Sequence, residues 1–308
     1  MTLRFVAGYF FTVKYMLKIE GAITALVTPI KKGGYVDYEC LKRLILRQIR
    51  LKASAIVVLG TTGEASAMPV YEHKKILEYA VTVSDGKIPV ISGCGSNDTA
   101  HAVEMTKFCK KIGATAGLSV TPYYNKTTQN GLIAHYFKIA DEADFPLIVY
   151  NVPSRTGMDI TTETYLKLIE NPNIVGIKEA SFDVNKLSSL SLISDKTAVY
   201  CGNDEAILPY FLSGAKGVIS VVANIIPDKI QYVYKMAKAG KIKEAKVEYD
   251  KYYGFIKSLF STVNPIPVKY AMSKLKLCEN RLILPLLPIK SSSLILKELK
   301  KVKSDVLP

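Results

Sequence analysis

The sequence predicts an eight-stranded (β/α)8 barrel followed by a group of helices at the C-terminus. Short apolar runs alternate with longer amphipathic segments, and the runs are eight in number. They are apolar throughout, without the polar alternation of a half-exposed strand. Continuously apolar strands are typical of a parallel sheet covered on both faces. Eight strand–helix units within roughly 220 residues favour a closed barrel.

The expected strands follow one another between residues 21 and 222. Their sequences are GAITALV (21–27), AIVVLG (55–60), IPVISG (88–93), TAGLSV (115–120), PLIVYN (146–151), IVGIKEA (174–180), TAVYCG (197–202) and GVISVV (217–222). The segments between them have helical spacing, as where Ile133, Phe137 and Ala140 recur at i, i+4 and i+7. Each apolar run is therefore followed by an amphipathic segment, which is the repeat of this fold.

After Gly240 the pattern becomes wholly helical. The candidate helices cover residues 241–262, 265–276 and 291–303. We therefore expect three parts: an N-terminal extension (1–18), the (β/α)8 barrel (19–238) and a C-terminal helical region (239–308).

A doubly wound sheet is the competing fold, and periodicity alone does not exclude it. The segment GCGSND at 93–98 lacks the third glycine of a dinucleotide-binding fingerprint. No GxxxxGK[ST] phosphate-binding loop is present either. The two best-known ligand signatures of the competing fold are thus missing.

Composition excludes several classes of protein. Hydrophobic residues make up 49% of the 308 residues and charged residues 22%, which excludes a disordered chain. The five cysteines are scattered and form no CxxC pair, which argues against a disulfide framework and fits a reducing compartment. The three histidines form no HExxH motif. We therefore predict neither a metal site nor a cofactor.

The net charge of +14 is concentrated near the C-terminus. Residues 235–308 contain 16 Lys or Arg against 6 Asp or Glu, which is ten of the fourteen excess charges. Lysine-coated terminal helices explain this excess, so we predict no nucleic-acid partner.

The sequence also predicts no membrane partner, because no stretch reaches the roughly 18–20 apolar residues that a membrane span needs. The apolar run at 5–13 lacks a signal-peptidase site and is followed by Lys14 and Lys18. We therefore predict a cytoplasmic location.

Polar residues gather where the expected strands end, which is where a barrel of this kind carries its functional groups. The second strand ends in GTTGE (60–64), the fourth in TPYYN (121–125) and the fifth in YNVPSRTG (150–157). The seventh ends in Gly202-Asn203-Asp204. These four loops are the candidate site.

Lys178 is the sharpest single signal, because it lies inside the apolar sixth strand. Desolvation favours the neutral amine, which is a nucleophile able to form a Schiff base with a ketone or an aldehyde. The alternative is a lysine that points outward, extending into solvent or pairing with Glu179. The strand sequence alone does not decide between these two orientations.

Hydroxyl groups accompany this lysine and offer a route for protons near one amine. They belong to Thr61, Thr62, Tyr123, Tyr124 and Tyr150. Taken singly, each is explained as a turn residue or as aromatic packing. Arg155 lies in the fifth-strand loop, where its planar guanidinium is suited to a carboxylate, with a surface salt bridge as the alternative.

Together these motifs carry a family resemblance. GTTGE, VTPYYNK, YNVPSRTG, IKEAS, GVISVVAN and NPIPVK occur in this order and at suitable spacing. The chain resembles the dihydrodipicolinate synthases, of the class I pyruvate-dependent aldolase/lyase superfamily, from about Ile19 to at least Pro288. The arginine loop is the most specific of these motifs, whereas GTTGE and the lysine are shared across the superfamily.

The resemblance implies a reaction. Such an enzyme condenses pyruvate with L-aspartate 4-semialdehyde through a lysine Schiff base, giving 4-hydroxy-tetrahydrodipicolinate for lysine and diaminopimelate biosynthesis. Lys178 would form the imine with pyruvate. Tyr150, Thr62 and Tyr124 would relay protons, with Tyr124 entering the site of a neighbouring subunit. A homotetramer built as a dimer of dimers is implied as well.

The resemblance also implies how the substrates are held. Thr61 and Thr62 would bind the pyruvate carboxylate through hydroxyl and backbone N–H groups. Arg155 would bind the carboxylate of aspartate semialdehyde. Gly202 and Ile219 would line the pocket with backbone groups.

Two other functions compete with this one. Another pyruvate aldolase, such as an N-acetylneuraminate or 2-keto-3-deoxy sugar acid lyase, would share the lysine. Such lyases usually have serine at the first hydroxyl position and a different loop where Arg155 stands. A non-catalytic barrel that binds RNA or serves as a scaffold would fit the basic C-terminus. The intact set of Lys178, Tyr150 and Thr62 argues against it.

The resemblance leads to a prediction about feedback. In lysine-inhibited relatives a glutamate pairs with the amino group of the effector, and His101 occupies its place here. An imidazole supplies no negative charge, so the charge-assisted contact is lost, although Asp98 offers partial compensation. Such a contact is worth roughly 2–5 kcal/mol, or on the order of a hundredfold in affinity. We expect weak or absent inhibition in a lysine titration of the enzyme. Half-inhibition at sub-millimolar lysine would refute this prediction.

Overall fold

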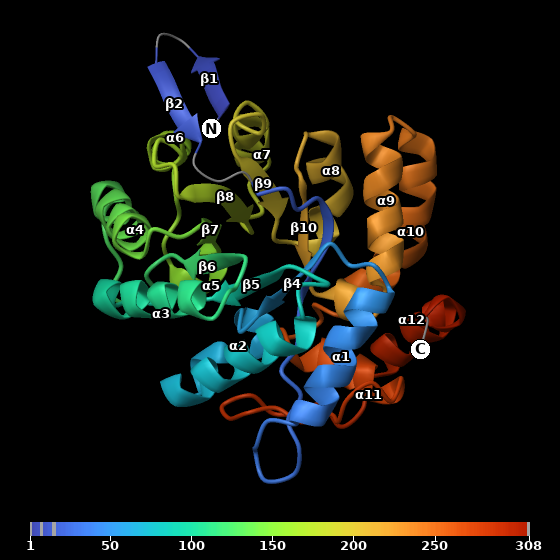
Figure 1. Ribbon diagram of the computed structural model, residues 1–308. Coiled ribbons are helices and arrows are strands. Elements are labelled where there is room, and N and C mark those ends of the chain that lie inside the picture. Colours follow the sequence, from blue (N-terminus) through green and yellow to red (C-terminus); the bar gives the residue numbers. More distant parts are fainter. Residues whose placement is uncertain (1, 7–8, 14–16, 307–308) are drawn as a thin grey trace.

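The fold is a closed barrel of eight parallel strands with helices around it (Figure 1). The computed structural model describes residues 2–6, 9–13 and 17–306. The barrel strands are β3 (Gly21–Ala25), β4 (Ala55–Val58), β5 (Val90–Gly93), β6 (Ala116–Val120), β7 (Leu147–Asn151), β8 (Ile174–Glu179), β9 (Ala198–Cys201) and β10 (Gly217–Ser220). Each lies within one of the eight apolar runs, and β10 pairs with β3 to close the barrel. The predicted fold class is confirmed.

Helices cover the outside of the barrel and follow the strands in chain order (Figure 1). They are α1 (Tyr38–Arg50), α2 (Val70–Ser84), α3 (Thr99–Lys111), α4 (Gln129–Ala143), α6 (Thr162–Leu168), α7 (Val184–Ser191), α8 (Ile207–Leu212) and α9 (Pro227–Lys238). A one-turn helix, α5 (Pro153–Thr156), lies in the loop after β7. Several of these helices begin at an N-cap residue whose side chain accepts a hydrogen bond from a backbone N–H group, such as Asp98 before α3 and Thr128 before α4.

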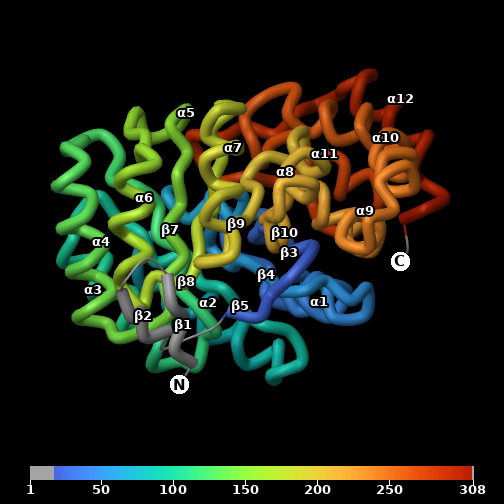
Figure 2. Tube along the Cα trace, turned by 90° about the horizontal axis from the view of Figure 1, so that it is seen from above, coloured from blue at the N-terminus to red at the C-terminus, as the bar shows by residue number. Residues whose placement is uncertain are grey.

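Three further helices form the predicted C-terminal group: α10 (Ile242–Ser258), α11 (Ile266–Lys274) and α12 (Ser293–Val302). Figure 2 shows them on one side of the barrel, with α10 alongside α9. Near the N-terminus, β1 (Thr2–Val6) and β2 (Tyr9–Val13) pair antiparallel. The sequence did not predict this strand pair. The division at residues 18 and 238 stays a prediction.

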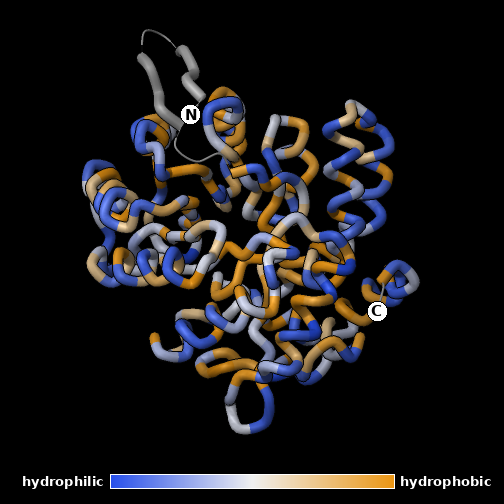
Figure 3. Tube along the Cα trace, in the orientation of Figure 1, coloured by the Kyte–Doolittle hydropathy of each residue, from blue (hydrophilic) through white to orange (hydrophobic). Residues whose placement is uncertain are grey.

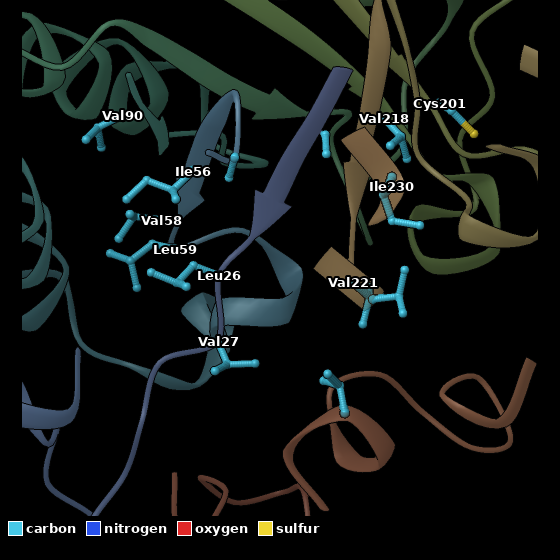
Figure 4. Packing of buried hydrophobic residues seen from close by; sticks show 14 of the residues in the cluster. Leu26, Val27, Ile56, Val58, Leu59, Val90, Cys201, Val218, Val221 and Ile230 are labelled. Atoms are coloured by element: carbon cyan, nitrogen blue, oxygen red, sulfur yellow. The ribbon is translucent and has the colours of Figure 1, made fainter. Parts of the chain in front are cut away.

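The core has two layers because successive side chains of a strand point to opposite faces. In β4, Ala55 and Val57 belong to the cluster inside the barrel, whereas Ile56 and Val58 belong to the larger cluster between barrel and helices. Figure 4 shows part of that outer cluster, where Ile56 and Val58 lie near Leu26. In Figure 3 hydrophilic and hydrophobic residues alternate along the surrounding helices, as is typical of amphipathic helices.

The described residues include no helix with the length and the apolar character of a membrane span. Nor do they contain a group of three or more His, Cys, Asp or Glu side chains that suits a metal ion.

Candidate active site

Lys178 points into the barrel, which decides the orientation that the sequence left open. Its neighbour Ile177 belongs to the outer cluster, so strand alternation turns Lys178 inward. Lys178 is only 6% exposed. Glu179 points outward and is fully buried, where its carboxylate accepts hydrogen bonds from Tyr165 (2.7 Å) and the Asn151 side chain (3.1 Å). The lysine is therefore neither exposed to solvent nor paired with Glu179.

Tyr150 is the nearest aromatic neighbour of this amine. The two residues are register partners on β7 and β8, and the Lys178 Nζ lies 4.0 Å from the centroid of the Tyr150 ring. Tyr150 is itself only 6% exposed. An ammonium over an aromatic face is attracted by the ring quadrupole. The ring therefore helps to hold the amine at one position within the barrel.

The turn after β4 carries Thr61 and Thr62 on a short 3-10 helix, η1 (Thr61–Gly63). Thr62 is buried, and its hydroxyl oxygen accepts a hydrogen bond of 2.9 Å from the side-chain amide of Asn264. The Thr28 hydroxyl donates to the carbonyl of Gly63 at 2.7 Å. Parallel strands end at the same rim of a barrel, so this turn and the Lys178 strand face one site. The turn is held by contacts from two other segments of the chain.

Arg155 lies on α5 with its side chain exposed. Its Nη2 donates a hydrogen bond of 3.2 Å to the backbone carbonyl of Asn264. Asn264 therefore contacts both Arg155 and Thr62, although it is more than 100 residues from either in sequence. NPIPVK is one of the motifs that carry the family resemblance, but its asparagine received no role from the sequence.

Tyr124 lies apart from this group within the single chain. It is 94% exposed, and its φ of +69° places it in the left-handed region, which is unusual for a bulky residue. No hydrogen bond joins it to Lys178, Tyr150 or Thr62 among the described residues. A solvent-facing tyrosine in a constrained backbone is instead available to another molecule.

Gly202 and Ile219 are at the ends of β9 and β10. The Gly202 N–H donates to the Glu179 carbonyl at 2.7 Å, and a Cβ on Gly202 would lie 2.7 Å from that of Ala180. Only glycine fits at this close approach of the two strands. Ile219 is 1% exposed and belongs to the inner cluster.

Asp204 is a further buried carboxyl group at this rim, and it received no role from the sequence. Its Oδ2 accepts from the backbone N–H groups of Val221 (2.9 Å) and Val222 (2.7 Å), which joins the loop after β9 to the loop after β10. Burial raises the pKa of Asp204 to about 6, against these hydrogen bonds and the positive charge of Lys178. A carboxyl group that is buried away from solvent therefore lies between the loops after β9 and β10.

The assembled group has a definite chemical capacity. A primary amine is buried beside a phenol in a largely apolar interior, and threonine hydroxyls and a guanidinium lie at the same rim. A buried amine is suited to nucleophilic attack on a carbonyl group, and the guanidinium to binding a carboxylate. The arrangement can support Schiff-base chemistry on an acidic substrate.

Comparison with known proteins points to one family. A family model described as the dihydrodipicolinate synthetase family matches residues 18–303. A 4-hydroxy-tetrahydrodipicolinate synthase of Sulfurihydrogenibium sp. is 45% identical over 276 residues, which is 89% of this chain and 94% of the relative. A synthase of the same name from Clostridium perfringens is 41% identical over 280 residues, which is 91% of this chain and 96% of the relative.

A solved structure agrees with these relatives. The chloride-inhibited dihydrodipicolinate synthase of Acinetobacter baumannii, complexed with pyruvate, superposes with a TM-score of 0.90 at 41% identity. The match covers 94% of this chain and 100% of that one.

The buried Asp204 predicts a pH dependence of stability. Its folded pKa of about 6 lies above the ordinary 3.8, so the folded state takes up a proton more readily than the unfolded chain. The stability that this proton contributes is complete below about pH 4 and is lost as the pH rises through 6. Asp204→Asn imitates the protonated group at every pH. Its free energy of unfolding, relative to the parent, should therefore rise between pH 4 and 7, by at most about 3 kcal/mol.

Urea titrations of both proteins between pH 4 and 8 measure this difference. A difference that stays constant over that range would contradict the assignment of the buried titration to Asp204.

Proposed function

The chain belongs to the dihydrodipicolinate synthetase family, and we propose that Lys178 is the residue through which it carries out the family reaction. The chain is a lyase with 4-hydroxy-tetrahydrodipicolinate synthase activity, which serves lysine and diaminopimelate biosynthesis. The reaction joins pyruvate to L-aspartate 4-semialdehyde. The observation that carries the assignment of Lys178 is its buried, inward-facing amine at 4.0 Å from the Tyr150 ring centroid.

The proposed reaction begins with attack of the neutral Lys178 amine on the C2 carbonyl of pyruvate. Loss of water gives an imine, and loss of a C3 proton gives an enamine. The enamine C3 attacks the aldehyde carbon of the second substrate, forming a carbon–carbon bond and an alkoxide that takes up a proton. The amino group of that substrate then attacks C2, displaces Lys178 and closes the ring. The amine of the enzyme is regenerated at the end.

The carboxylate of pyruvate is assigned to the turn after β4 in this proposal. Thr61 and Thr62 offer two hydroxyl groups and two backbone N–H groups, which are suitable donors to an anion. Backbone groups of Gly202 and Ile219 complete the pocket. The contacts of Thr28 with Gly63 and of Asn264 with Thr62 support this assignment, because a rigid turn loses little entropy on binding.

Protons would pass through Tyr150, Thr62 and Tyr124 of a partner subunit. The 94% exposure of Tyr124 supports a role in another chain. A dimer of dimers needs a second contact surface, and the exposed Phe182, Val184 and Leu192 around α7 supply apolar area for it. We therefore propose a homotetramer. A cytoplasmic location is part of the proposal as well, supported by free thiols that suit a reducing compartment.

The first prediction concerns the covalent intermediate. Borohydride added with pyruvate should reduce an imine on Lys178, adding the mass of the reduced pyruvate to the peptide that contains this residue. Lys178→Ala should remove the adduct and lower turnover by several orders of magnitude, because the covalent route is lost. Peptide mass spectrometry measures the adduct, and turnover is assayed separately. An adduct on a different lysine would contradict the assignment.

The second prediction concerns recognition of the aldehyde. If the planar guanidinium of Arg155 binds the carboxylate of aspartate semialdehyde through two N–H groups, Arg155→Lys keeps the charge but loses this bidentate geometry. The KM for aspartate semialdehyde should rise on the order of tenfold or more, whereas imine trapping with pyruvate should stay close to that of the parent. The two half-reactions are measured separately. Equal loss in both would mean that Arg155 maintains the structure of the loop and does not bind this substrate.

A further inference from the structure

The segment 264–269 contacts the turn after β4 at two points. At its beginning, the side-chain amide of Asn264 donates to the Thr62 hydroxyl oxygen at 2.9 Å. At its end, the ammonium of Lys269 pairs with the carboxylate of Glu64. Thr62 and Glu64 are two residues apart on the turn, and both partners come from a segment about 200 residues later in the chain. One segment of the C-terminal region therefore contacts both sides of Gly63.

The ion pair between Glu64 and Lys269 is fully buried, with both side chains 0% exposed. Each partner also forms a hydrogen bond to the irregular segment that follows α11. The Ile283 N–H donates to Glu64 Oε2 at 2.8 Å, and Lys269 Nζ donates to the Arg281 carbonyl at 2.9 Å. A buried ion pair is costly to desolvate and is retained only with such additional hydrogen bonds. Because such a pair contributes little net stability, its main effect beside the turn after β4 is to hold the conformation of that turn.

The backbone conformation of Glu64 also indicates that the turn is held in one geometry. Its φ of +58° lies in the left-handed region, where glycine is the favoured residue. Glu64 connects the two short helices η1 and η2 (Ala65–Ala67) at this strained position. A non-glycine residue is held there only when its surroundings over-determine the conformation, and here the side chain supplies the constraint.

We propose that Asn264 and Lys269 are positioning residues for pyruvate: acting through Thr62 and Glu64, they hold the backbone N–H and hydroxyl groups of Thr61 and Thr62 at the place of the substrate carboxylate. This inference rests on the proposed role of the turn. It gives the NPIPVK segment a function in the reaction, although neither residue touches the substrate.

Two variants test the inference. Asn264→Ala removes the donor to Thr62 and keeps the backbone carbonyl that accepts from Arg155. Glu64→Gln/Lys269→Met removes both buried charges together, so that no uncompensated charge remains in the interior. Tyr252→Phe is the matched control, because it removes a hydrogen bond between Tyr252 and Asp305 (3.0 Å) within the same C-terminal region, away from the turn.

The measurement is the pyruvate concentration at half-maximal imine trapping on Lys178, taken with the KM for each substrate and with thermal melting. Each test variant should raise the half-saturating pyruvate concentration about tenfold and change the KM for aspartate semialdehyde much less. The control should melt at a lower temperature and keep the parental pyruvate value. A loss of general stability lowers the melting temperature but does not alter the pyruvate affinity of the molecules that remain folded. The two measurements together therefore separate a positioning role from a structural one.

Two results would overturn the inference: folded test variants with the parental pyruvate value, or an equal rise in the KM for both substrates. If the double variant does not fold, Asn264→Ala alone carries the test, since Asn264 is only partly buried. Failure of the proposed function looks different. In that case the parent protein itself forms no pyruvate adduct on Lys178, and the inference falls with the function on which it rests.

Discussion

The whole site depends on keeping one primary amine inside an apolar barrel. Strand alternation turns Lys178 inward, where the apolar side chains of the cluster inside the barrel do not solvate the amine. The Tyr150 ring at 4.0 Å is the principal partner that the interior provides. An amine that is buried and held in place is well positioned to attack a carbonyl group. In the proposed reaction, the other groups at the rim act on the molecule that this amine binds.

The surrounding contacts show how the barrel supports that position. On the outer face of the same strand, the buried carboxylate of Glu179 accepts from Tyr165 and Asn151, which fixes β8 against β7 and α6. Asp204 joins the loops after β9 and β10, and the segment 264–269 holds the turn after β4. Strand β8 and the loops after β4, β9 and β10 are thus fixed by polar contacts. Such contacts contribute little net stability but define one geometry, which a reaction with two acidic substrates requires.

The sequence predicted the features that depend on local pattern. All eight strands follow from apolar runs, and the candidate residues at the rim follow from the rule that barrel strands end on one face. It did not predict the contacts of Asn264 and Lys269, because these join segments about 200 residues apart that periodicity does not relate. The orientation of Lys178 needed the strand register, and the exposure of Tyr124 needed the loop conformation. The paired strands β1 and β2 also went unpredicted, since a short apolar run beside lysines has no distinctive period.

A crystal structure of the protein after borohydride reduction in the presence of pyruvate tests the central claim most directly. We expect continuous electron density from Lys178 Nζ to C2 of the reduced pyruvate, with the carboxylate against the backbone N–H groups of Thr61 and Thr62. Pyruvate bound covalently to another lysine, or its carboxylate placed away from this turn, would contradict the account.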